Sequence, residues 1–246
     1  KNNIKAIVNV TSDKVYEKKE WTWAYRENDR IGGFDPYSSS KGCAELLTSS
    51  YQNSYFNLSK YKKDHHTLIA TCRAGNVIGG GDWAEDRLIV DLIKSSIKNE
   101  KLLIRSPHAV RPWQHVLDPL SGYLSIGKKL LEEDKKFATS WNFGPSDTKG
   151  ATVEDVVTKM KTFWDKLDYG VSADTNQPHE ANLLRLDSSQ AQIKLNWKGV
   201  WPYEKALEKT ASWYQSYYEQ DQVLTKDDLL SYVSDAKSQG LEWAQS

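Results

Sequence analysis

The sequence predicts an α/β protein built on a doubly wound parallel sheet, because strand-like and helix-like segments alternate along its first part. Residues 6–10 are mostly apolar on both faces, as in a strand that is buried within a parallel sheet. Residues 67–73 have the same character and are followed by Gly75. Between the two strands, a turn at Pro36 leads into a helical segment, which can supply the right-handed crossover between parallel neighbours.

Mixed α/β structure is predicted to continue downstream. Residues 88–97 have a helical pattern, and residues 102–104 form a short strand-like run. The apolar residues of the segment 152–167 recur at helical spacing, and Thr152 and Asp155 stand at the distance of a capping box. This segment is therefore predicted to be an amphipathic helix.

The carboxyl-terminal part is predicted to be helical. Pro202 favours the start of a helix, and the apolar residues from Tyr203 to Tyr217 form one face of it. After Glu219 charged residues prevail, which predicts a helical tail. At its other end the chain opens without Met, directly on a strand-like run, so we expect it to begin in mid-fold, with earlier strands missing.

The charge balance argues against a nucleic-acid-binding protein. The 246 residues include 33 Lys and Arg and 33 Asp and Glu, so the formal net charge is zero. Proteins that bind nucleic acid need an excess of cations to displace counterions from phosphates. No apolar run approaches the roughly 20 residues that span a bilayer, so no association with a membrane is expected. A hydrophobic content of 39% suffices to bury a large core.

The two cysteines exclude a disulfide framework. Cys43 and Cys72 each stand in a segment that is predicted to be regular and mostly buried. This usage fits the reducing cytoplasm. No metal site is predicted, since His65 and His66 stand in a polar stretch without further ligands nearby.

Residues with chemical capability follow the first predicted strand. Ser12, Asp13 and Lys14 stand just beyond residues 6–10. This is the carboxyl end of the strand, where open α/β sheets place ligand groups. We therefore expect these three side chains to face a ligand.

Tyr37 and Lys41 lie one helical turn apart and so share a helix face. Of the 13 tyrosines in the chain, Tyr37 alone has a lysine four residues later. An ammonium group beside a phenol favours the phenolate, which makes the phenol a usable base. Ser12 can then share the proton that is moved. The pair predicts a site of proton transfer.

Six short segments stand in a characteristic order along the chain. They are Thr-Ser-Asp-Lys (11–14), Pro-Tyr-Ser-Ser-Ser-Lys (36–41), Arg-Ala-Gly-Asn-Val (73–77), Arg-Pro-Trp (111–113), Asn-Phe-Gly (142–144) and Leu-Asp-Ser (186–188). In this arrangement the chain resembles the extended short-chain dehydrogenase/reductases. Residues 12–16, 79–83 and 177–182 extend the resemblance to the nucleotide-sugar 4,6-dehydratases, and it covers residues 1 to about 218.

The resemblance implies a Rossmann-type sheet that binds NAD and a smaller mixed α/β domain that binds a nucleotide sugar. The family begins with a strand and a glycine-rich turn that holds the NAD pyrophosphate, and this sequence contains no such turn. The Rossmann-type sheet is therefore expected to be partial. The expected division is residues 1–77 and 109–146 for the NAD-binding domain, 78–108 and 147–218 for the nucleotide-sugar-binding domain, and 219–246 for a helical tail.

The implied reaction converts CDP-glucose to CDP-4-keto-6-deoxyglucose by internal hydride transfer through NAD. Tyr37, aided by Lys41 and Ser12, would take the proton of the sugar 4-hydroxyl while hydride leaves C4, and Tyr37 and Lys41 would also contact the cofactor. Asp13 would be the acid that expels the 6-hydroxyl, which requires a protonated carboxyl. Lys14 would either remove the C5 proton as a neutral amine or stabilise the enolate, and the sequence leaves both roles open.

The resemblance also implies contacts with the nucleotide sugar at Asn76, Arg87, Arg111 and His179. The planar fork of an arginine donates two parallel hydrogen bonds to a pyrophosphate. Family members pair through long helices, so a homodimer is expected through residues 46–55. The implied setting is deoxysugar biosynthesis in the cytoplasm, as for the O-antigen of lipopolysaccharide.

Two alternatives stay open. A nucleotide-sugar epimerase of the same superfamily would share Tyr37 and Lys41 but needs no acid to expel a hydroxyl, so Asp13 and Lys14 favour a dehydratase. From a different class, the chain could be a non-catalytic fragment that needs its missing amino-terminal half.

Overall fold

The structure is a computed structural model that describes residues 4–19, 21–145, 150–172 and 184–245. The chain forms two compact units. Unit 1 comprises residues 1–75, 118–144 and 185–198, and unit 2 comprises residues 76–117, 145–184 and 199–246. Among the described residues, no helix is long and apolar enough to cross a membrane.

The units differ from the expected division mainly in three places, besides one or two residues at two boundaries. Residues 109–117 belong to unit 2, because the two strands they contain pair with other strands of that unit. Residues 185–198 belong to unit 1, where their helix packs beside the sheet. The tail after Glu219 is part of unit 2.

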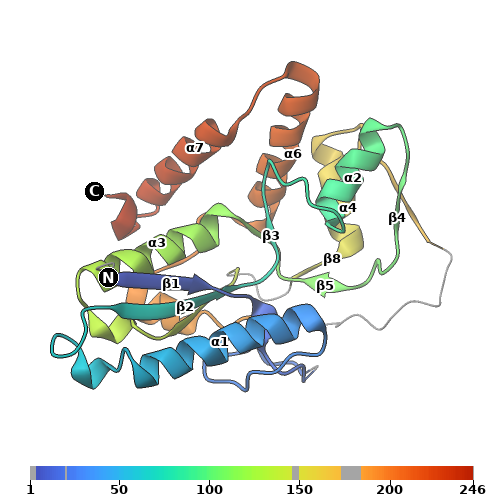
Figure 1. Ribbon diagram of the computed structural model, residues 1–246. Helices are drawn as coiled ribbons and strands as arrows, with labels where there is room; N and C mark the ends of the chain where they lie inside the picture. The colour runs from blue at the N-terminus through green and yellow to red at the C-terminus, as the bar shows by residue number, and fades with distance from the viewer. Residues whose placement is uncertain (1–3, 20, 146–149, 173–183, 246) are drawn as a thin grey trace. The chain divides into compact units, whose positions relative to one another are not determined.

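Unit 1 contains a parallel sheet with the strand order β1–β2–β7 (Figure 1). The strands are β1 (Ala6–Val10), β2 (Leu68–Ala74) and β7 (Ser140–Phe143). The prediction of a parallel α/β sheet is confirmed. Within the described part of the chain, β1 is an edge strand and is half-buried, whereas the sequence predicted a strand that is buried on both faces.

Helices cover both faces of this sheet. Helix α1 (Pro36–Ser54) lies on one face, and α3 (Leu117–Leu131) lies on the other (Figure 1). Helix α5 (Ser189–Leu195) packs on the same side as α3. Short 3-10 helices follow at η1 (Asp13–Val15), η2 (Leu58–Lys60) and η3 (Lys135–Phe137).

The face of the sheet towards α3 and α5 is apolar, and we call it the apolar face. Phe143 lies so close to α3 that a Cβ added at Gly122 would come within 2.3 Å of its ring, so glycine permits this contact. Burial of these side chains is the main source of the unit's stability. The cluster on this face includes Leu68, Ala70, Cys72, Ile126, Leu130, Trp141, Phe143 and Trp197.

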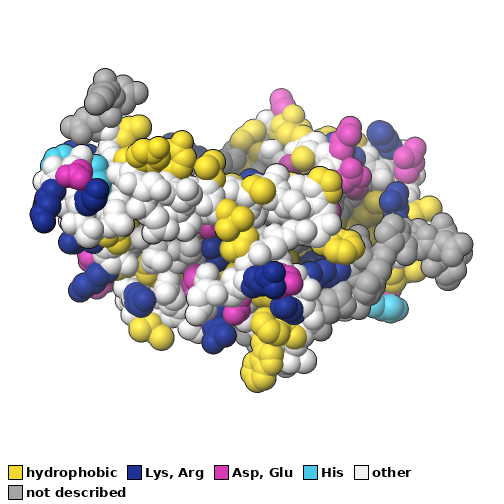
Figure 2. Space-filling model, turned by 60° about the horizontal axis from the view of Figure 1, so that its bottom comes forward, with side chains coloured by type: hydrophobic (Ala, Val, Ile, Leu, Met, Phe, Trp, Pro, Cys, Tyr) yellow, Lys and Arg dark blue, Asp and Glu magenta, His cyan; other side chains and the backbone are white. Residues whose placement is uncertain are grey.

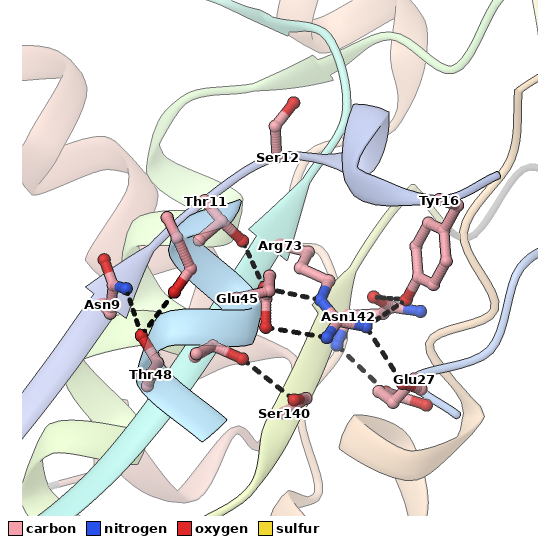
Figure 3. A network of polar contacts seen from close by, with 12 residues as sticks. Asn9, Thr11, Ser12, Tyr16, Glu27, Glu45, Thr48, Arg73, Ser140 and Asn142 are labelled. Carbon is pink, nitrogen blue, oxygen red and sulfur yellow. Dashed lines mark hydrogen bonds and ion pairs between the residues drawn. The ribbon is translucent and has the colours of Figure 1, made fainter. Parts of the chain in front are cut away.

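The face towards α1 is polar, and we call it the polar face. Successive residues of a strand point to opposite faces of the sheet. Each strand therefore sends its intervening residues to α1. The polar ones are Asn9 of β1, Thr11 just beyond the end of β1, Thr71 and Arg73 of β2, and Ser140 and Asn142 of β7 (Figure 3).

Unit 2 is built on helices with short strand pairs between them. Its helices are α2 (Leu88–Ile97), α4 (Val153–Phe163), α6 (Tyr203–Gln220) and α7 (Thr225–Ser238), with η4 (Glu242–Ala244) near the end. The parallel pairs are β3 (Val77–Ile78) with β6 (Gln114–His115) and β4 (Leu102–Ile104) with β9 (Tyr169–Val171). The antiparallel pair is β5 (Val110–Arg111) with β8 (Ala151–Thr152).

The predicted capping box begins α4. The Thr152 side chain accepts from the backbone N–H of Asp155, and the carboxylate of Asp155 accepts from the backbone N–H of Thr152. The helix ends at Phe163 rather than at residue 167, because Trp164 turns to an extended conformation with φ −147° and ψ 102°. Trp164 nevertheless stays buried in the core of the unit.

The glycine loop after β3 is fastened to α6. A Cβ at Gly80 would lie 2.0 Å from the indole of Trp213, so only glycine permits this approach. The Tyr214 hydroxyl accepts from the backbone N–H of Asp82 (3.0 Å) and donates to its carbonyl (2.6 Å). The Trp83 ring then stands among four aromatic rings of α6, those of Trp213, Tyr214, Tyr217 and Tyr218.

Candidate active site

Ser12, Asp13 and Lys14 follow β1 at its carboxyl end, where the sequence predicts ligand contacts. Ser12 caps η1, since its Oγ accepts from the backbone N–H of Lys14 (3.2 Å), and the same hydroxyl donates to Oδ1 of Asp13 (3.0 Å). Ser12 and Asp13 are only 8% and 3% exposed, whereas Lys14 is exposed. The Asp13 carboxyl is thus held away from water with the Ser12 hydroxyl beside it.

Tyr37 and Lys41 lie in the first two turns of α1. The Nζ of Lys41 is 5.9 Å from the centroid of the Tyr37 ring, so the expected shared face is present. The Tyr37 side chain is 53% exposed. Among the described residues, neither its hydroxyl nor the Lys41 ammonium has a hydrogen-bond or ion-pair partner, so both are available to a ligand.

The start of α1 is fixed by Asp35 and Pro36. The Asp35 carboxylate accepts from the backbone N–H (3.0 Å) and the hydroxyl (2.6 Å) of Ser38, and Pro36 occupies the first turn. The hydrogen bonds from Ser38, with a smaller contribution from the charge of Lys14, hold the pKa of Asp35 below its usual value. Lys14 therefore lies near the beginning of α1.

Helix α1 packs against η1, and a glycine lets it approach the loop at Gly32, whose N–H donates to the carbonyl of Val15 in η1. A Cβ at Gly42 would meet the carbonyl oxygen of Gly32 at 2.7 Å. The structure thus gathers Ser12, Asp13, Lys14, Tyr37 and Lys41 in one part of unit 1, between the end of β1 and the start of α1.

A network of buried polar side chains lies beside this group, on the polar face (Figure 3). Arg73 and Glu45 form a two-pronged ion pair, with Nε to Oε1 at 2.7 Å and Nη2 to Oε2 at 2.8 Å. The Thr11 hydroxyl donates to the same Oε1 (2.5 Å). Thr11 points into the network, whereas Ser12 points away from it (Figure 3).

The network continues from Arg73 to β7. The Nη1 of Arg73 donates to the Tyr16 hydroxyl (2.7 Å) and to the carbonyl of Glu27 (3.0 Å). The Tyr16 hydroxyl donates to Oδ1 of Asn142 (2.7 Å), and Nδ2 of Asn142 donates to the carbonyl of Tyr25 (2.9 Å). Burial raises the pKa of Tyr16 to about 12, against the opposing charge of Arg73, so its hydroxyl stays protonated.

Glu45 and Arg73 were not among the site residues predicted from the sequence. One signal was present, because Glu45 follows Lys41 by four residues and so continues the face that Tyr37 and Lys41 share. A second signal was an arginine inside an apolar strand, since a buried charge needs a partner.

Three of the residues expected to bind the nucleotide sugar lie in unit 2. Asn76 is half-buried, and its carbonyl accepts from the backbone N–H of Gln114 (3.2 Å). Arg87 is exposed and precedes α2, while Arg111 lies in β5 and donates to the carbonyl of Val110 (3.0 Å). His179 lies outside the described residues.

Comparison with known proteins places this geometry in a family. The family model described as "NAD dependent epimerase/dehydratase family" matches residues 1–139, which is more than half of the chain and includes the Tyr37 and Lys41 pair. The chain belongs to this family. The expected resemblance to extended short-chain dehydrogenase/reductases is confirmed.

Curated relatives of the NAD dependent epimerase/dehydratase family extend the match. The chain is 47% identical over 234 residues to the CDP-glucose 4,6-dehydratase of Salmonella typhimurium, which covers 94% of this chain and 65% of that protein. It is 24% identical over 215 residues to a trifunctional protein of Arabidopsis thaliana whose name includes UDP-glucose 4,6-dehydratase, covering 86% of this chain and 29% of that protein. The chain thus spans less than two thirds of the length of these relatives.

Solved structures share the fold of this chain. The dTDP-glucose 4,6-dehydratase of Bacillus anthracis, solved in complex with NAD, matches with a TM-score of 0.68 at 21% identity, over 86% of this chain and 62% of that one. The UDP-glucuronic acid 4-epimerase of Bacillus cereus matches with a TM-score of 0.69 at 18% identity, over 87% and 62%. The predicted Rossmann-type fold class is confirmed by these matches.

Proposed function

We propose that the protein is a nucleotide-sugar 4,6-dehydratase that uses NAD and acts on CDP-glucose. The observation that carries this proposal is the buried Ser12 and Asp13 pair next to the exposed Tyr37 and the half-buried Lys41. The 47% identity to the CDP-glucose 4,6-dehydratase of Salmonella typhimurium supports the choice of substrate.

Tyr37 and Lys41 are suited to hold the reactive end of NAD. The Tyr37 hydroxyl and the Lys41 ammonium are both unengaged by the described residues and can donate to hydroxyls of the cofactor. When bound, NAD supplies the acceptor for a hydride from the sugar and returns that hydride to another carbon of the same sugar.

The chain's own residues move the protons of this reaction. Tyr37, as the base, takes the proton from the sugar 4-hydroxyl, and the adjacent Lys41 cation stabilises the phenolate that does so. The 4-ketone that results acidifies the hydrogen at C5. Asp13 then protonates the departing 6-hydroxyl, a step that requires the protonated carboxyl.

Lys14 has two possible roles that differ in charge. As a base for the C5 hydrogen it must be neutral, whereas as a stabiliser of the enolate it must carry its proton. In the first role Lys14 itself accepts the C5 proton, and in the second role a separate base must accept it while Lys14 holds the enolate oxygen, so we propose Lys14 for this step with both roles open. A K14R variant, which keeps the charge and cannot act as a base, separates the two roles, because it retains dehydration only if Lys14 is a stabiliser.

We propose that Asn76, Arg87, Arg111 and His179 contact the nucleotide sugar. The two guanidinium groups suit the pyrophosphate, because each keeps its charge and donates hydrogen bonds in a fixed plane. Arg111→Met is expected to raise KM for the nucleotide sugar while changing kcat much less.

The direct test is mass spectrometry of sugar nucleotides incubated with NAD and the protein. Two forms are compared, the 246-residue chain alone and the chain fused to the part of the Salmonella typhimurium relative that it does not span. CDP-glucose is expected to lose one water in at least one form, with dTDP-, UDP- and GDP-hexoses as controls. If no hexose loses water in either form, the proposal is wrong.

Asp13→Asn separates the dehydratase from an epimerase. The variant is expected to keep 4-oxidation, seen as absorbance of reduced cofactor, and to lose dehydration by a factor on the order of 100 or more. Unchanged dehydration would remove Asp13 from the mechanism. A titration of the chain alone with NAD tests the alternative of a non-catalytic fragment, since an active chain must bind the cofactor.

We propose a homodimer through the outer face of α1. Leu46, Leu47, Tyr51 and Tyr55 are exposed along this face. Figure 2 shows hydrophobic side chains exposed among polar ones in the view from below. Leu47→Glu is expected to give a monomeric mass by light scattering, whereas Leu124→Glu on α3 leaves the mass unchanged. A monomeric mass of the unmodified protein refutes the dimer.

We propose the cytoplasm as the compartment and deoxysugar biosynthesis, as for lipopolysaccharide O-antigen, as the setting. Cys43 and Cys72 are free thiols, which the reducing cytoplasm preserves. Cys43 is exposed rather than buried as the sequence predicted, because it lies on the outer side of α1. Recovery of the protein in the periplasmic fraction would contradict this assignment.

A further inference from the structure

The ion pair between Arg73 and Glu45 is the centre of the polar face. Both side chains are almost completely buried, at 3% and 4% exposed. Four of the five N–H groups of Arg73 are used, two on Glu45, one on Tyr16 and one on the Glu27 carbonyl. The Arg73 guanidinium therefore has a single orientation, and its two hydrogen bonds to Glu45 fix the orientation of that carboxylate as well.

Electrostatics keep this pair ionised. Burial opposes the charge of Glu45, but the hydrogen bonds and the charge of Arg73 outweigh it and hold the Glu45 pKa below its usual value. Glu45 in turn keeps the Arg73 guanidinium charged despite its burial. Buried ion pairs are poor sources of stability, because desolvation offsets their attraction and well-packed apolar residues often replace them without loss. The pair is thus better explained by the fixed positions that it gives to α1 and β2 than by a gain in stability.

The pair joins the elements that carry the candidate catalytic residues. Glu45 stands one turn after Lys41 and two turns after Tyr37, on the same helix face. Its Oε1 also accepts from Thr11, the residue that precedes Ser12. One carboxylate therefore ties the helix of the proposed base to the strand end of the proposed acid.

Two further contacts hold α1 in the same register along the sheet. The Asn9 amide donates to the Thr48 hydroxyl (2.8 Å), and the Gln52 amide donates to the carbonyl of Ile69 (2.8 Å). Helix α1 buries only Ser38, Gly42 and Glu45, so apolar packing does not fix its position. A slip of α1 by one residue would move Tyr37 by 1.5 Å along the axis and turn it by about 100°.

We propose that Glu45, held by Arg73, is a positioning residue that sets the register of α1 against β1 and so places Tyr37 and Lys41 beside Ser12 and Asp13. Glu45 acts through the helix and touches neither substrate nor cofactor. The kinetic part of this inference rests on the proposed function, whereas the structural part does not.

The test replaces the charged centre by an apolar one. The variant T11V/E45L/R73M removes both charges and the hydroxyl that would lose its acceptor, so it leaves no buried unpaired charge. It is expected to melt close to the wild-type temperature. In the form that dehydrates the sugar, kcat is expected to fall about 100-fold, as for a displacement of about 1 Å in an active site, while KM for the nucleotide sugar stays within about threefold.

Amide hydrogen exchange of residues 37–44 reports the position of α1 without any activity. These amides are expected to exchange at least about tenfold faster in the triple variant, because a helix that is no longer fastened opens locally more often. Asn53→Ala is the matched control, since it removes an exposed polar contact within α1 that does not reach the sheet, and it is expected to change neither kcat nor exchange at residues 37–44.

Single substitutions at Thr11 serve if the triple variant does not fold. Thr11→Val removes only the hydroxyl and is expected to lower kcat and speed exchange at residues 37–44, whereas Thr11→Ser keeps the hydroxyl and both properties. If the triple variant folds and its amides at residues 37–44 exchange at the wild-type rate, the proposal is overturned. If the triple variant does not fold, wild-type exchange in T11V overturns it. Wild-type kcat despite faster exchange overturns it too. Absence of dehydration in the unmodified protein refutes the proposed function instead and leaves the exchange result to decide the positioning role.

Discussion

The two faces of the three-stranded sheet in unit 1 are packed by different forces. On the apolar face, α3 and α5 meet the strands through side chains such as Leu68, Trp141 and Phe143. On the polar face, α1 meets the same strands through an ion pair and amide hydrogen bonds, with Glu45 as its one buried charged residue among those described.

The difference between the faces corresponds to two requirements. The hydrophobic effect is non-directional, because burial of apolar surface is favourable in any orientation. It therefore stabilises a unit without closely defining the register of a helix. Hydrogen bonds have narrow distance and angle limits, so they define register at little net gain in stability. The face that carries Tyr37 and Lys41 is the face that uses directional contacts.

The largest effect is expected on the apolar face. Phe143→Ala leaves a cavity between β7 and α3 and is expected to lower the free energy of unfolding by about 3–5 kcal/mol. Urea denaturation measures the change. Leu124→Ala on the exposed side of α3 is the control and is expected to change stability by less than about 0.5 kcal/mol. Equal effects of the two variants would mean that this face is not the core.

A smaller effect is expected for the neighbouring residue, which points to the polar face. Asn142→Leu keeps the volume but leaves the carbonyl of Tyr25 without its donor and the Tyr16 hydroxyl without its acceptor. The expected loss is about 3 kcal/mol, as for buried polar groups that lose their partners. Urea denaturation at neutral pH measures it, with the exposed Asn53→Ala as control. A stable N142L protein would show that the polar face tolerates apolar packing.

The smallest effect concerns a buried polar group that has no ionic partner, His115 in unit 2. Burial, with a contribution from the charge of Lys209, lowers the pKa of His115 to about 4. The unfolded chain, with a pKa near 6.5, binds a proton that the folded chain resists, so the contribution of His115 is complete above pH 6.5 and is lost as the pH falls towards 4. Between pH 7 and pH 5 the wild type is expected to lose about 2 kcal/mol more than His115→Asn. Parallel pH dependences of the two proteins in urea denaturation would contradict this assignment.

Local patterns predicted much of the fold. The strand over residues 6–10, the helix over residues 88–97 and the capping box of Thr152 match the structure, because each depends on neighbours in the sequence. The pairing of Tyr37 with Lys41 was predicted for the same reason, since one helical turn separates them.

Long-range contacts explain what was missed. The partnership of Glu45 with Arg73 joins residues that are 28 positions apart, and no local pattern specifies it. The polar face was not predicted from residues 6–10, because Ile7 is apolar and polar residues alternate with apolar ones only from Asn9 onward. Residues 109–117 lie in unit 2 because their strands pair with distant segments of that unit, and no local pattern specifies this pairing.

The fastening of the glycine loop to α6 gives the protein a built-in optical reporter. The indoles of Trp83 and Trp213 have ring centroids 6.3 Å apart and are inclined by 61°. Chromophores fixed at such close range in an asymmetric setting produce a near-ultraviolet circular dichroism signal that depends on their packing. Any ligand that shifts the segment from Gly79 to Trp83 will therefore change this spectrum, and loop movement can be followed in solution without a label.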